Sequence, residues 1–391
     1  MITLLRTDNF KSLLGTEVPF AGNTMIVGDN ASGKSSVLLA LDLLISSVRT
    51  DFSSFLEELG LVFSDLLSHL SGSSAQEQIC FHSEWQLPRS DSSTLSLSWE
   101  LEVAASPDGS LFLRREEITD LDSGAALLSF SPDGQSRILK LSDRAGHTVT
   151  YPPLAFMSSA LKYLAPQLAD SLPELAVFRE YLLHSFSCGI LSPSGMRHSR
   201  VAQTAMPGRG GVLLPSLIRS MDPQSRRSLN ERISRILDGR ISEIDALKDE
   251  YTGQISLETV EELGAGKVRF ASGNISDGVL RLAAILAVCE GSGPGLVLVD
   301  EIENGIHYVH SEELINLLRE VCAEKHLQVV AATHNTVLLD FVEPESIVLL
   351  HRHPRTGVTS ATSMAGLTQV KELEEFMFPG EILLNNPEIY I

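Results

Sequence analysis

One short stretch constrains the fold of this chain more than any other: the glycine-rich sequence GDNASGKS at residues 28–35, which fits the pattern G-x-x-x-x-G-K-[ST]. The apolar run TMIV before it predicts a buried strand. KSSVLLALDLLISSV after the second glycine has apolar residues at helical spacing and predicts a helix to about Val48. A glycine-rich turn between strand and helix directs backbone N–H groups and the positive end of the helix dipole at one point. The sequence therefore predicts a phosphate-binding loop for a nucleoside triphosphate.

Two residues of this loop have distinct predicted roles. Lys34 is expected to reach the β- and γ-phosphates, and the Ser35 hydroxyl is expected to bind Mg²⁺. The alternative, a chance match in a glycine-rich turn, does not account for the strand before the loop and the helix after it. The predicted nucleotide-binding residues of the loop are Asn30, Ala31, Ser32, Gly33, Lys34, Ser35 and Ser36.

The composition is that of a globular protein without a membrane anchor. A length of 391 residues allows two or three domains, and 43% of the residues are hydrophobic. No run of 18 apolar residues predicts a membrane span, and the start MITLLRTDNF lacks the pattern of a signal peptide. The four cysteines stand far apart, which argues against a zinc ribbon or a disulfide framework. We expect a cytoplasmic protein that does not contact a membrane.

The charge distribution leaves two interpretations open for one segment. The net charge of −20 should repel nucleic acid on average. The segment from Arg197 to Arg240 nevertheless contains nine arginines against three acidic residues, a net charge of +6. These arginines form either a basic surface that contacts nucleic acid or a solvated helix face that pairs with acidic neighbours. The second interpretation is favoured.

The pattern along the chain predicts an α/β protein. Residues 1–27 are expected to form short strands, and QICFHSEWQL, TLSLSWELEVA and SLFLRREEI are expected to form antiparallel strands. A mainly helical region is predicted from about Pro153 to Leu247. Proline and glycine interrupt the chain too often for a long coiled-coil arm between the loop and residue 270.

Two further apolar strands end on chemically active residues. GLVLVDEIENGIH (295–307) predicts a buried parallel strand followed by Asp300, which can hold Mg²⁺, and Glu301, which can orient or deprotonate an attacking water. LQVVAATHN (327–335) predicts a strand that ends at His334. One helix fits between them, so a right-handed β-α-β crossover should make the two strand ends neighbours. Glu301 and His334 are therefore the candidate catalytic residues.

A second anion site is predicted in NISDGVLRLAAILAV (274–288). Ser276, Asp277 and Gly278 stand at the start of an apolar helix, where backbone N–H groups and a serine hydroxyl point outward. The alternative is an ordinary helix N-cap by Ser276 or Asp277.

Together these motifs resemble the ATP-binding-cassette (ABC) ATPases, most closely the SMC/RecF-like branch and the bacterial ATPases related to the OLD-family ATPase module. GDNASGKSS is similar to the Walker A motif, ISDGVLRLAAIL to the signature, VLVDEIENGIH to the Walker B motif and D-loop, and ATHN to the H-loop of that branch. The start LLRTDNFKSL resembles its N-terminal strand and turn. The resemblance covers about residues 1–50 and 265–360.

This resemblance implies ATP and Mg²⁺ as ligands and an ABC-ATPase head with an N-terminal antiparallel β-lobe, a parallel-sheet core and a mainly helical insertion. Residues 1–150 would form the first half of the head, 151–265 the insertion or lid, and 266–391 the second half. In such families two heads close face to face, so the signature would cap the ATP of the partner head. Further implied roles are nucleotide contact by Lys11, interface support by Arg281, and a place at the dimer seam for Glu303, Asn304 and His307.

The sequence departs from the pattern of this branch in two places. Ile302 and Tyr308 stand where proline is frequent, and neither change removes a catalytic group. The Q-loop glutamine is not placed; Gln76, Gln78 and Gln86 are the candidates.

Three functions remain open. The first is an ATP-gated dimer or higher oligomer that acts as a switch or motor in DNA maintenance or anti-phage defence. Its nuclease or toxin is expected on a separate effector chain, because the one Asp-x-Asp match, Asp120-Leu121-Asp122, has the pattern of a turn between strands. The second is a regulatory scaffold or sensor that hydrolyses ATP slowly and holds a partner protein. The third, an ABC-transporter subunit, is disfavoured by the Ser-Asp-Gly signature and the large insertion.

Overall fold

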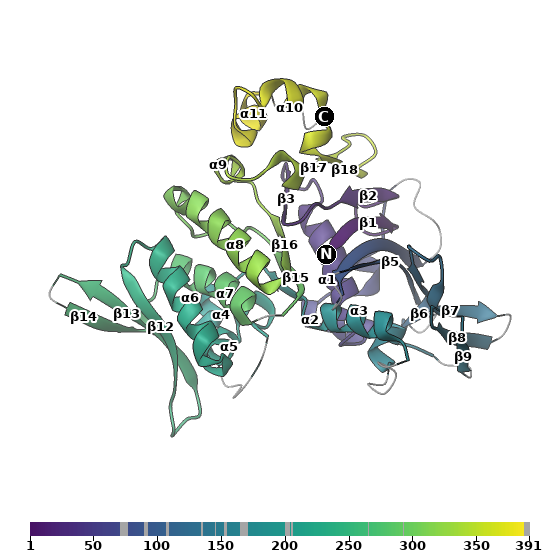
Figure 1. Cartoon of the computed structure of the whole chain (residues 1–391), viewed down its shortest axis with the longest axis horizontal. Helices are drawn as coiled ribbons and strands as arrows, with labels where there is room; N and C mark the ends of the chain where they lie inside the picture. The colour runs from purple at the N-terminus through teal and green to yellow at the C-terminus, as the bar shows by residue number, and fades with distance from the viewer. Residues whose placement is uncertain are drawn as a thin grey trace.

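A central sheet in the computed structural model has an antiparallel β-lobe on one side and a group of helices on the other (Figure 1). The structure describes residues 1–70, 77–89, 93–106, 109–133, 136–144, 146–151, 155–164, 171–199, 204, 206–264, 266–291 and 293–386. Gln76 lies outside the described residues. Within them, no helix is both long and apolar enough to cross a membrane.

The central sheet is six-stranded in the order β10-β15-β16-β3-β17-β18 and parallel except for its last pair. β15 and β16 are parallel neighbours joined through helix α8, as the predicted crossover requires. Its strands are β3 (Thr24–Gly28), β10 (Phe186–Gly189), β15 (Gly295–Val299), β16 (Leu327–Ala332), β17 (Ile347–Arg352) and β18 (Thr359–Ser363).

Strands β3, β15 and β16 and most of β17 are buried on both faces, which explains their continuous apolar sequences. Alternate residues point to opposite faces. Leu298 and Val330 pack with helix α1 and the β-lobe, whereas Val299 and Val329 pack with the helices on the other side. The helices are α1 (Lys34–Ser46), α2 (Phe52–Leu59), α3 (Pro173–Leu183), α4 (Pro193–Met196), α5 (Leu214–Ser220), α6 (Pro223–Ile236), α7 (Asp277–Gly291), α8 (Ser311–Lys325), α9 (Thr336–Leu339), α10 (Thr368–Leu373) and α11 (Pro379–Asn385).

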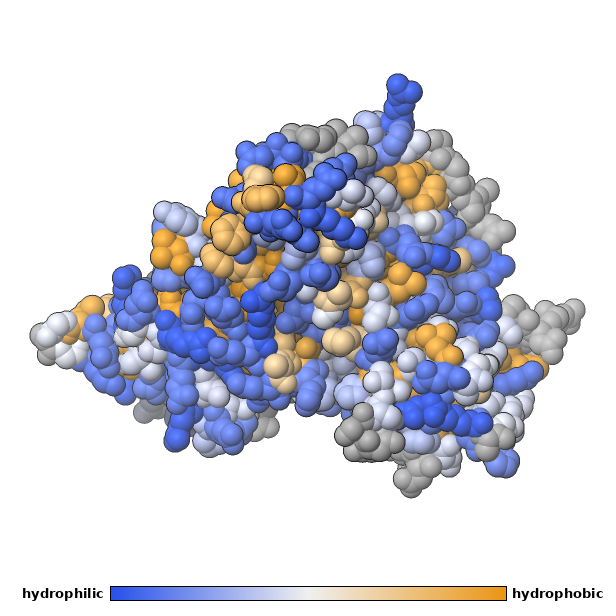
Figure 2. All heavy atoms as spheres, turned by 45° about the horizontal axis from the view of Figure 1, so that its top comes forward, coloured by the Kyte–Doolittle hydropathy of each residue, from blue (hydrophilic) through white to orange (hydrophobic). Residues whose placement is uncertain are grey.

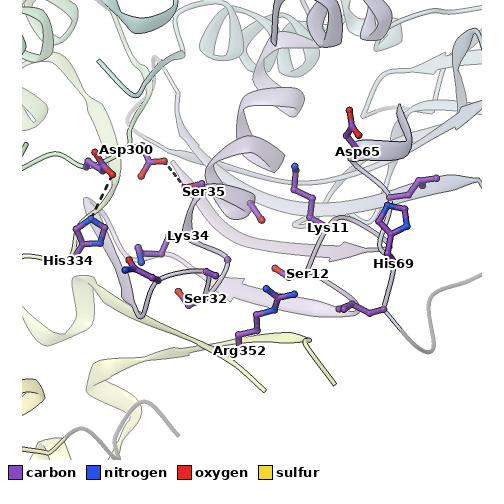
Figure 3. A pocket seen from close by; sticks show the side chains of 17 residues that line it. Lys11, Ser12, Ser32, Lys34, Ser35, Asp65, His69, Asp300, His334 and Arg352 are labelled. Atoms are coloured by element: carbon purple, nitrogen blue, oxygen red, sulfur yellow. Dashed lines mark hydrogen bonds and ion pairs between the residues drawn. The ribbon is translucent and has the colours of Figure 1, made fainter. Parts of the chain in front are cut away.

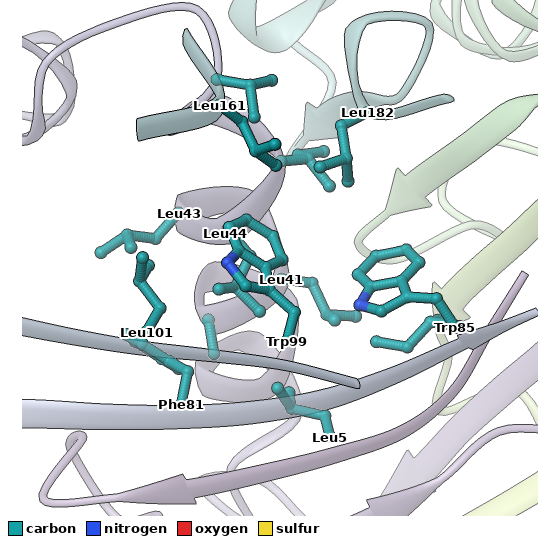
Figure 4. Close-up of a cluster of buried hydrophobic side chains, with 14 of the residues drawn as sticks. Leu5, Leu41, Leu43, Leu44, Phe81, Trp85, Trp99, Leu101, Leu161 and Leu182 are labelled. Carbon is teal, nitrogen blue, oxygen red and sulfur yellow. The ribbon is translucent and has the colours of Figure 1, made fainter. Parts of the chain in front are cut away.

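The β-lobe is an eight-stranded antiparallel sheet that covers α1. Alternating burial along its long strands gives it one apolar face, and Figure 4 shows Leu41 and Leu44 of α1 next to Trp85 and Trp99 from that face. α1 therefore lies between two sheets, which fixes the P-loop at its start. The strands are β1 (Ile2–Asp8), β2 (Thr16–Pro19), β4 (Gln78–Pro88), β5 (Thr94–Ala105), β6 (Leu111–Asp120), β7 (Ala126–Asp133), β8 (Ser136–Ser142) and β9 (Thr148–Tyr151).

The segment 151–265 is more mixed than the predicted helical insertion. It contributes α3 to α6, but also β10 of the central sheet and strands of a third, antiparallel sheet. In that sheet β13 (Ile255–Leu263) pairs with β11 (His198–Ser199), β12 (Ile241–Lys248) and β14 (Gly266–Ala271). Asp120 is the last residue of β6 and pairs with Arg144, and Leu121 and Asp122 lie in the turn that follows, so the Asp-x-Asp match stands at a turn between strands.

A buried ion cluster joins α6, α7 and α8. Arg232 of α6 is 8% exposed, and its Nε donates to Glu290 Oε1 at 2.5 Å; Glu290 is 2% exposed. Arg232 also contacts Glu324 on α8, and Lys325 Nζ lies 3.6 Å from Glu290 Oε2. Removing one member of such a cluster leaves a buried charge without compensation.

We therefore expect Arg232→Ala to lower the free energy of unfolding by about 3–5 kcal/mol, measured by denaturant titration. The control is Arg227→Ala on the same helix, where the side chain is exposed and the change should stay within about 0.5 kcal/mol. Equal effects of the two substitutions would show that the cluster does not stabilise the helix packing.

A second buried charge pins a loop onto the β-lobe. Glu116 of β6 is fully buried and accepts hydrogen bonds from Trp99 Nε1 at 2.9 Å, Ser159 Oγ at 2.5 Å and the Ala160 N–H at 2.7 Å. Burial raises the pKa of Glu116 from 4.5 to about 7, although the hydrogen bonds oppose this shift.

Between those pKa values the folded protein holds a proton that the unfolded chain has released. Stability should therefore decrease as the pH rises from about 4.5 to 7, by up to ~3 kcal/mol, and change little through this group above pH 7. Glu116→Gln should flatten this part of the curve, as measured by urea denaturation at pH 5, 6, 7 and 8. An unchanged slope would mean that Glu116 does not titrate in this range.

Candidate nucleotide-binding site

The P-loop lies between β3 and α1 and depends on two glycines. A Cβ on Gly28 would lie 2.3 Å from the Leu350 carbonyl oxygen, so no larger residue fits between β3 and β17. Gly33 has a φ of 110° and faces Thr359, whose Oγ1 a Cβ would approach to 2.7 Å. The Thr359 hydroxyl donates to the Ser32 carbonyl at 2.9 Å. The C-terminal hairpin β17–β18 therefore holds the loop in its shape.

Lys34 is buried, and its ammonium group forms hydrogen bonds with carbonyl groups of its own loop. Nζ donates to the Gly28 carbonyl at 2.7 Å and to the Asp29 carbonyl at 2.9 Å. Burial lowers the pKa of Lys34, and the nearby carboxylate of Asp300 opposes the shift.

Ser35 and Asp300, the two predicted Mg²⁺ ligands, lie next to each other at the carboxyl edge of the central sheet. Ser35 Oγ donates to Asp300 Oδ2 at 2.8 Å (Figure 3). A hydroxyl and a carboxylate oxygen are hard donors of the kind that Mg²⁺ takes when a phosphate and water complete its shell. The two groups therefore fit the predicted metal.

Glu301 and His334 are also neighbours, because β15 and β16 end side by side. His334 Nε2 lies 3.9 Å from Glu301 Oε1, and Asn304 Nδ2 donates to Glu301 Oε2 at 3.0 Å. Glu301 has a left-handed backbone with a φ of 53°, an unfavourable conformation for this residue type. The backbone N–H of His334 donates to Glu303 Oε1 at 3.0 Å, and this hydrogen bond joins the D-loop to the end of β16.

These groups open into one cleft of about 540 Å³ (Figure 3). Lys11, Asn30 to Ser36, Asp300, Glu301 and His334 all line it. Sequence reasoning missed further lining residues, which come from the turn after β1, the segment after α2 and the end of β17. These residues are Ser12, Asp65, Leu67, His69, Leu70 and Arg352.

The signature residues stand apart from this cleft: among the described residues that line it, none of Ser276, Asp277 and Gly278 appears. Ser276 and Asp277 are exposed at the start of α7. Arg197 Nη1 donates to the Ile275 carbonyl at 2.9 Å, and its Nη2 donates to Asp277 Oδ1 at 2.8 Å. Gly278 packs on the D-loop so closely that a Cβ would lie 2.0 Å from the Gly305 carbonyl oxygen. The signature segment is thus fixed by Arg197 and the D-loop, and its Ser276 and Asp277 face solvent.

The two placed Q-loop candidates also lie elsewhere. Gln78 of β4 accepts a hydrogen bond from Arg114 on the β-lobe. Gln86 lies near the other end of β4 and lines a different cavity. Neither is among the described residues of the nucleotide cleft.

The arginine-rich segment pairs extensively with acidic residues, which favours the solvated-face interpretation over a nucleic-acid surface. Arg200 lies outside the described residues, whereas Arg227 and Arg240 are exposed. Ion pairs join Arg197 to Asp277, Arg209 to Asp42, Arg226 to Asp245, Arg232 to Glu290 and Arg235 to Glu320.

Comparison with solved structures gives the fold. An SMC head bound to the C-winged helix domain of ScpA aligns with 95% of this chain and 99% of that chain, with a TM-score of 0.55 and 15% identity. The Smc head from Pyrococcus furiosus, with an extended coiled coil and bound to the C-terminal domain of ScpA, aligns with 96% of this chain and 98% of that chain. Its TM-score is 0.52 and its identity 14%. This chain has the fold of an SMC head.

Sequence comparison supports the same assignment. Residues 178–340, less than half of the chain, match the family described as AAA domain, putative AbiEii toxin, type IV TA system. No curated protein matches the sequence. The predicted resemblance to the SMC/RecF-like ATPases and the predicted α/β head fold are confirmed.

The P-loop assignment is tested by Lys34→Ala. Loss of a buried ammonium group that donates to phosphate oxygens should weaken MgATP binding by at least ~100-fold, measured by isothermal titration. Lys162→Ala, which removes a lysine that pairs with Asp51 elsewhere, should bind as the wild type does. Tight MgATP binding by the Lys34 variant would contradict the assignment.

Proposed function

We propose that this chain binds ATP with Mg²⁺, hydrolyses it, and closes as a head-to-head dimer that switches a partner protein. The observation that carries the proposal is the meeting of three sequence-distant groups in one cleft. These are Lys34 and Ser35 of the P-loop, Asp300 with Glu301 after β15, and His334 after β16.

Each of these residues has a task that follows from its position. Lys34 would exchange the two loop carbonyls for phosphate oxygens, which are better acceptors for an ammonium group. Glu301 would orient or deprotonate the attacking water, and His334 would steady it from the neighbouring strand end. Bound Mg²⁺, held by Ser35 and Asp300, would supply charge neutralisation at the phosphates.

The position of the signature supports closure between two heads. Ser276 and Asp277 are exposed and do not line the cleft of their own chain among its described residues. A second copy can present this helix N-terminus to the γ-phosphate, which a single copy does not do in this conformation. Tyr308 and Val309 of the adjoining D-loop are 61% and 65% exposed, and such apolar groups suit a protein interface.

The C-terminal helices support a separate partner chain. Phe376 and Phe378, between α10 and α11, are 81% and 62% exposed, and Leu384 is 65% exposed. Figure 2 shows apolar side chains among hydrophilic ones over these helices, at the top of that view. Both SMC heads named above bind ScpA. The family match to a putative toxin of a toxin–antitoxin system favours defence over DNA maintenance as the setting.

A slow, regulatory ATPase that holds a partner is the second candidate. Glu301 is engaged on both carboxylate oxygens, by Asn304 and by His334, and must leave at least one of these contacts to act on water. Turnover that stays slow when the partner is present would favour this candidate.

Glu301→Gln tests the switch. It should keep MgATP binding, lower hydrolysis by ~10²–10⁴-fold, and roughly double the mass in light scattering when MgATP is added. The added substitution Ser276→Arg should abolish the mass increase without weakening nucleotide binding, because it blocks only the cap.

Two outcomes of that measurement would contradict the proposal. A monomer that binds MgATP but gains no mass would remove head-to-head closure. A doubled mass without nucleotide would mean that ATP does not gate the assembly.

A further inference from the structure

A second cavity, of about 460 Å³, lies at the end of the central sheet opposite the P-loop. Leu327, the first residue of β16, lines it, whereas the P-loop follows the last residue of the parallel strand β3. The β4–β5 end of the β-lobe and the last turns of α8 form its walls. The volume is that of a site for a small organic molecule.

Tyr181 lines this cavity and carries a buried hydroxyl group without a partner in the described part of the chain. It is 4% exposed, it lines the cavity, and its hydroxyl oxygen has no hydrogen-bond partner among the described residues. The edge-on contact with Trp85, 6.0 Å between ring centroids, holds the ring in place. Burial raises the pKa of Tyr181, so the group stays a neutral hydroxyl that can donate. Leaving such a donor unpaired is unfavourable, and an acceptor from a ligand would remove that cost.

The other lining residues favour a ligand with an apolar body and a negative charge. Leu87, Pro88 and Leu327 offer apolar walls, and Arg319 and His326 stand on the α8 side. No acidic residue is among the described residues that line the cavity, so its lining offers no carboxylate to a cation although the whole chain carries a charge of −20.

Arg319 is available to an anion from outside. It is about half-exposed, and one of its terminal nitrogens, Nη2, donates to the Phe341 carbonyl at 2.7 Å and lies 3.4 Å from Glu343 Oε1. These contacts hold the guanidinium at the α8 surface and use one of its three nitrogens. The other two retain N–H groups for a carboxylate.

We propose that this cavity binds a small amphipathic carboxylate. The apolar body of the ligand lies between Leu87 and Leu327. A neutral oxygen at its inner end accepts a hydrogen bond from the Tyr181 hydroxyl, and its carboxylate forms an ion pair with Arg319. The inference is independent of nucleotide binding, because the two cavities share no lining residue in the described part of the chain.

The probe for this site is 6-methoxy-2-naphthylacetate, with two relatives that each lack one group. 2-Naphthylacetate lacks the acceptor, and 2-(6-methoxy-2-naphthyl)ethanol lacks the carboxylate. Binding to the full chain is followed by isothermal titration. Ala323→Trp, at an exposed lining position of α8, should fill the cavity and abolish binding, whereas Lys34→Ala should leave binding unchanged.

Pairwise substitution then locates each contact. Tyr181→Phe should weaken the methoxy probe by ~3–10-fold and leave 2-naphthylacetate unaffected. Arg319→Met should weaken the methoxy probe by ~10-fold and leave the alcohol unaffected. These selective losses are not expected from a general disturbance of the fold.

Three results would overturn the inference. The first is a probe that does not bind the wild-type chain. The second is binding that survives Ala323→Trp, which would place the probe elsewhere. The third is an equal loss of affinity for all three molecules in each side-chain variant, which would remove the assigned contacts.

Discussion

The pairing of β16 with β15 on one side and with β3 on the other is the contact on which the site depends. It brings the carboxyl ends of three strands together, and each end continues into one part of the cleft. The hydrogen bonding extends beyond the strands: the Thr333 N–H donates to Ile26, and the Ile302 N–H donates to Ala332. Ser35 and Asp300, 265 residues apart in sequence, are thereby held at hydrogen-bond distance. A shift of β16 by one residue would exchange its two buried faces and separate these groups.

The parts of the site that could be predicted from sequence are those at strand ends. There, a few chemically distinctive residues follow an apolar run, and the crossover rule makes the ends neighbours. Arg352 ends β17, the other parallel neighbour of β3, so the rule for strand ends could have found it. His69 could not be predicted this way, because it lies in an irregular segment after α2 and no spacing marks it. The third sheet was missed for a related reason. Strand β14 is largely exposed, and β12 buries only Ile241, Ile244 and Ala246 among polar and charged residues, so the apolar alternation of both strands is weak.

The arginine-rich segment shows how a local charge count misleads. Over 44 residues the segment is basic, but its partners lie elsewhere in the chain: Arg232 binds Glu290, 58 residues away, and Glu324, 92 residues away. The fold places α6 beside α7 and α8, where Arg232 and Arg235 join the helices through ion pairs and do not form a free basic surface. A surface for nucleic acid needs cations that the fold leaves free, and only tertiary structure reveals which ones those are.

The two cavities differ in how their polar groups are satisfied, and this difference separates a switch from a simple binding site. In the nucleotide cleft, Lys34 and Glu301 already have partners within the chain, so a ligand must replace existing contacts. Binding there is an exchange, and the released loop carbonyls and Asn304 are free to rearrange the P-loop and D-loop. At the second cavity the Tyr181 hydroxyl has no partner among the described residues, so an acceptor adds a contact without breaking one. Under the proposed functions, occupation of the first cleft would therefore change the conformational balance of the head, whereas occupation of the second would stabilise the conformation that already exists.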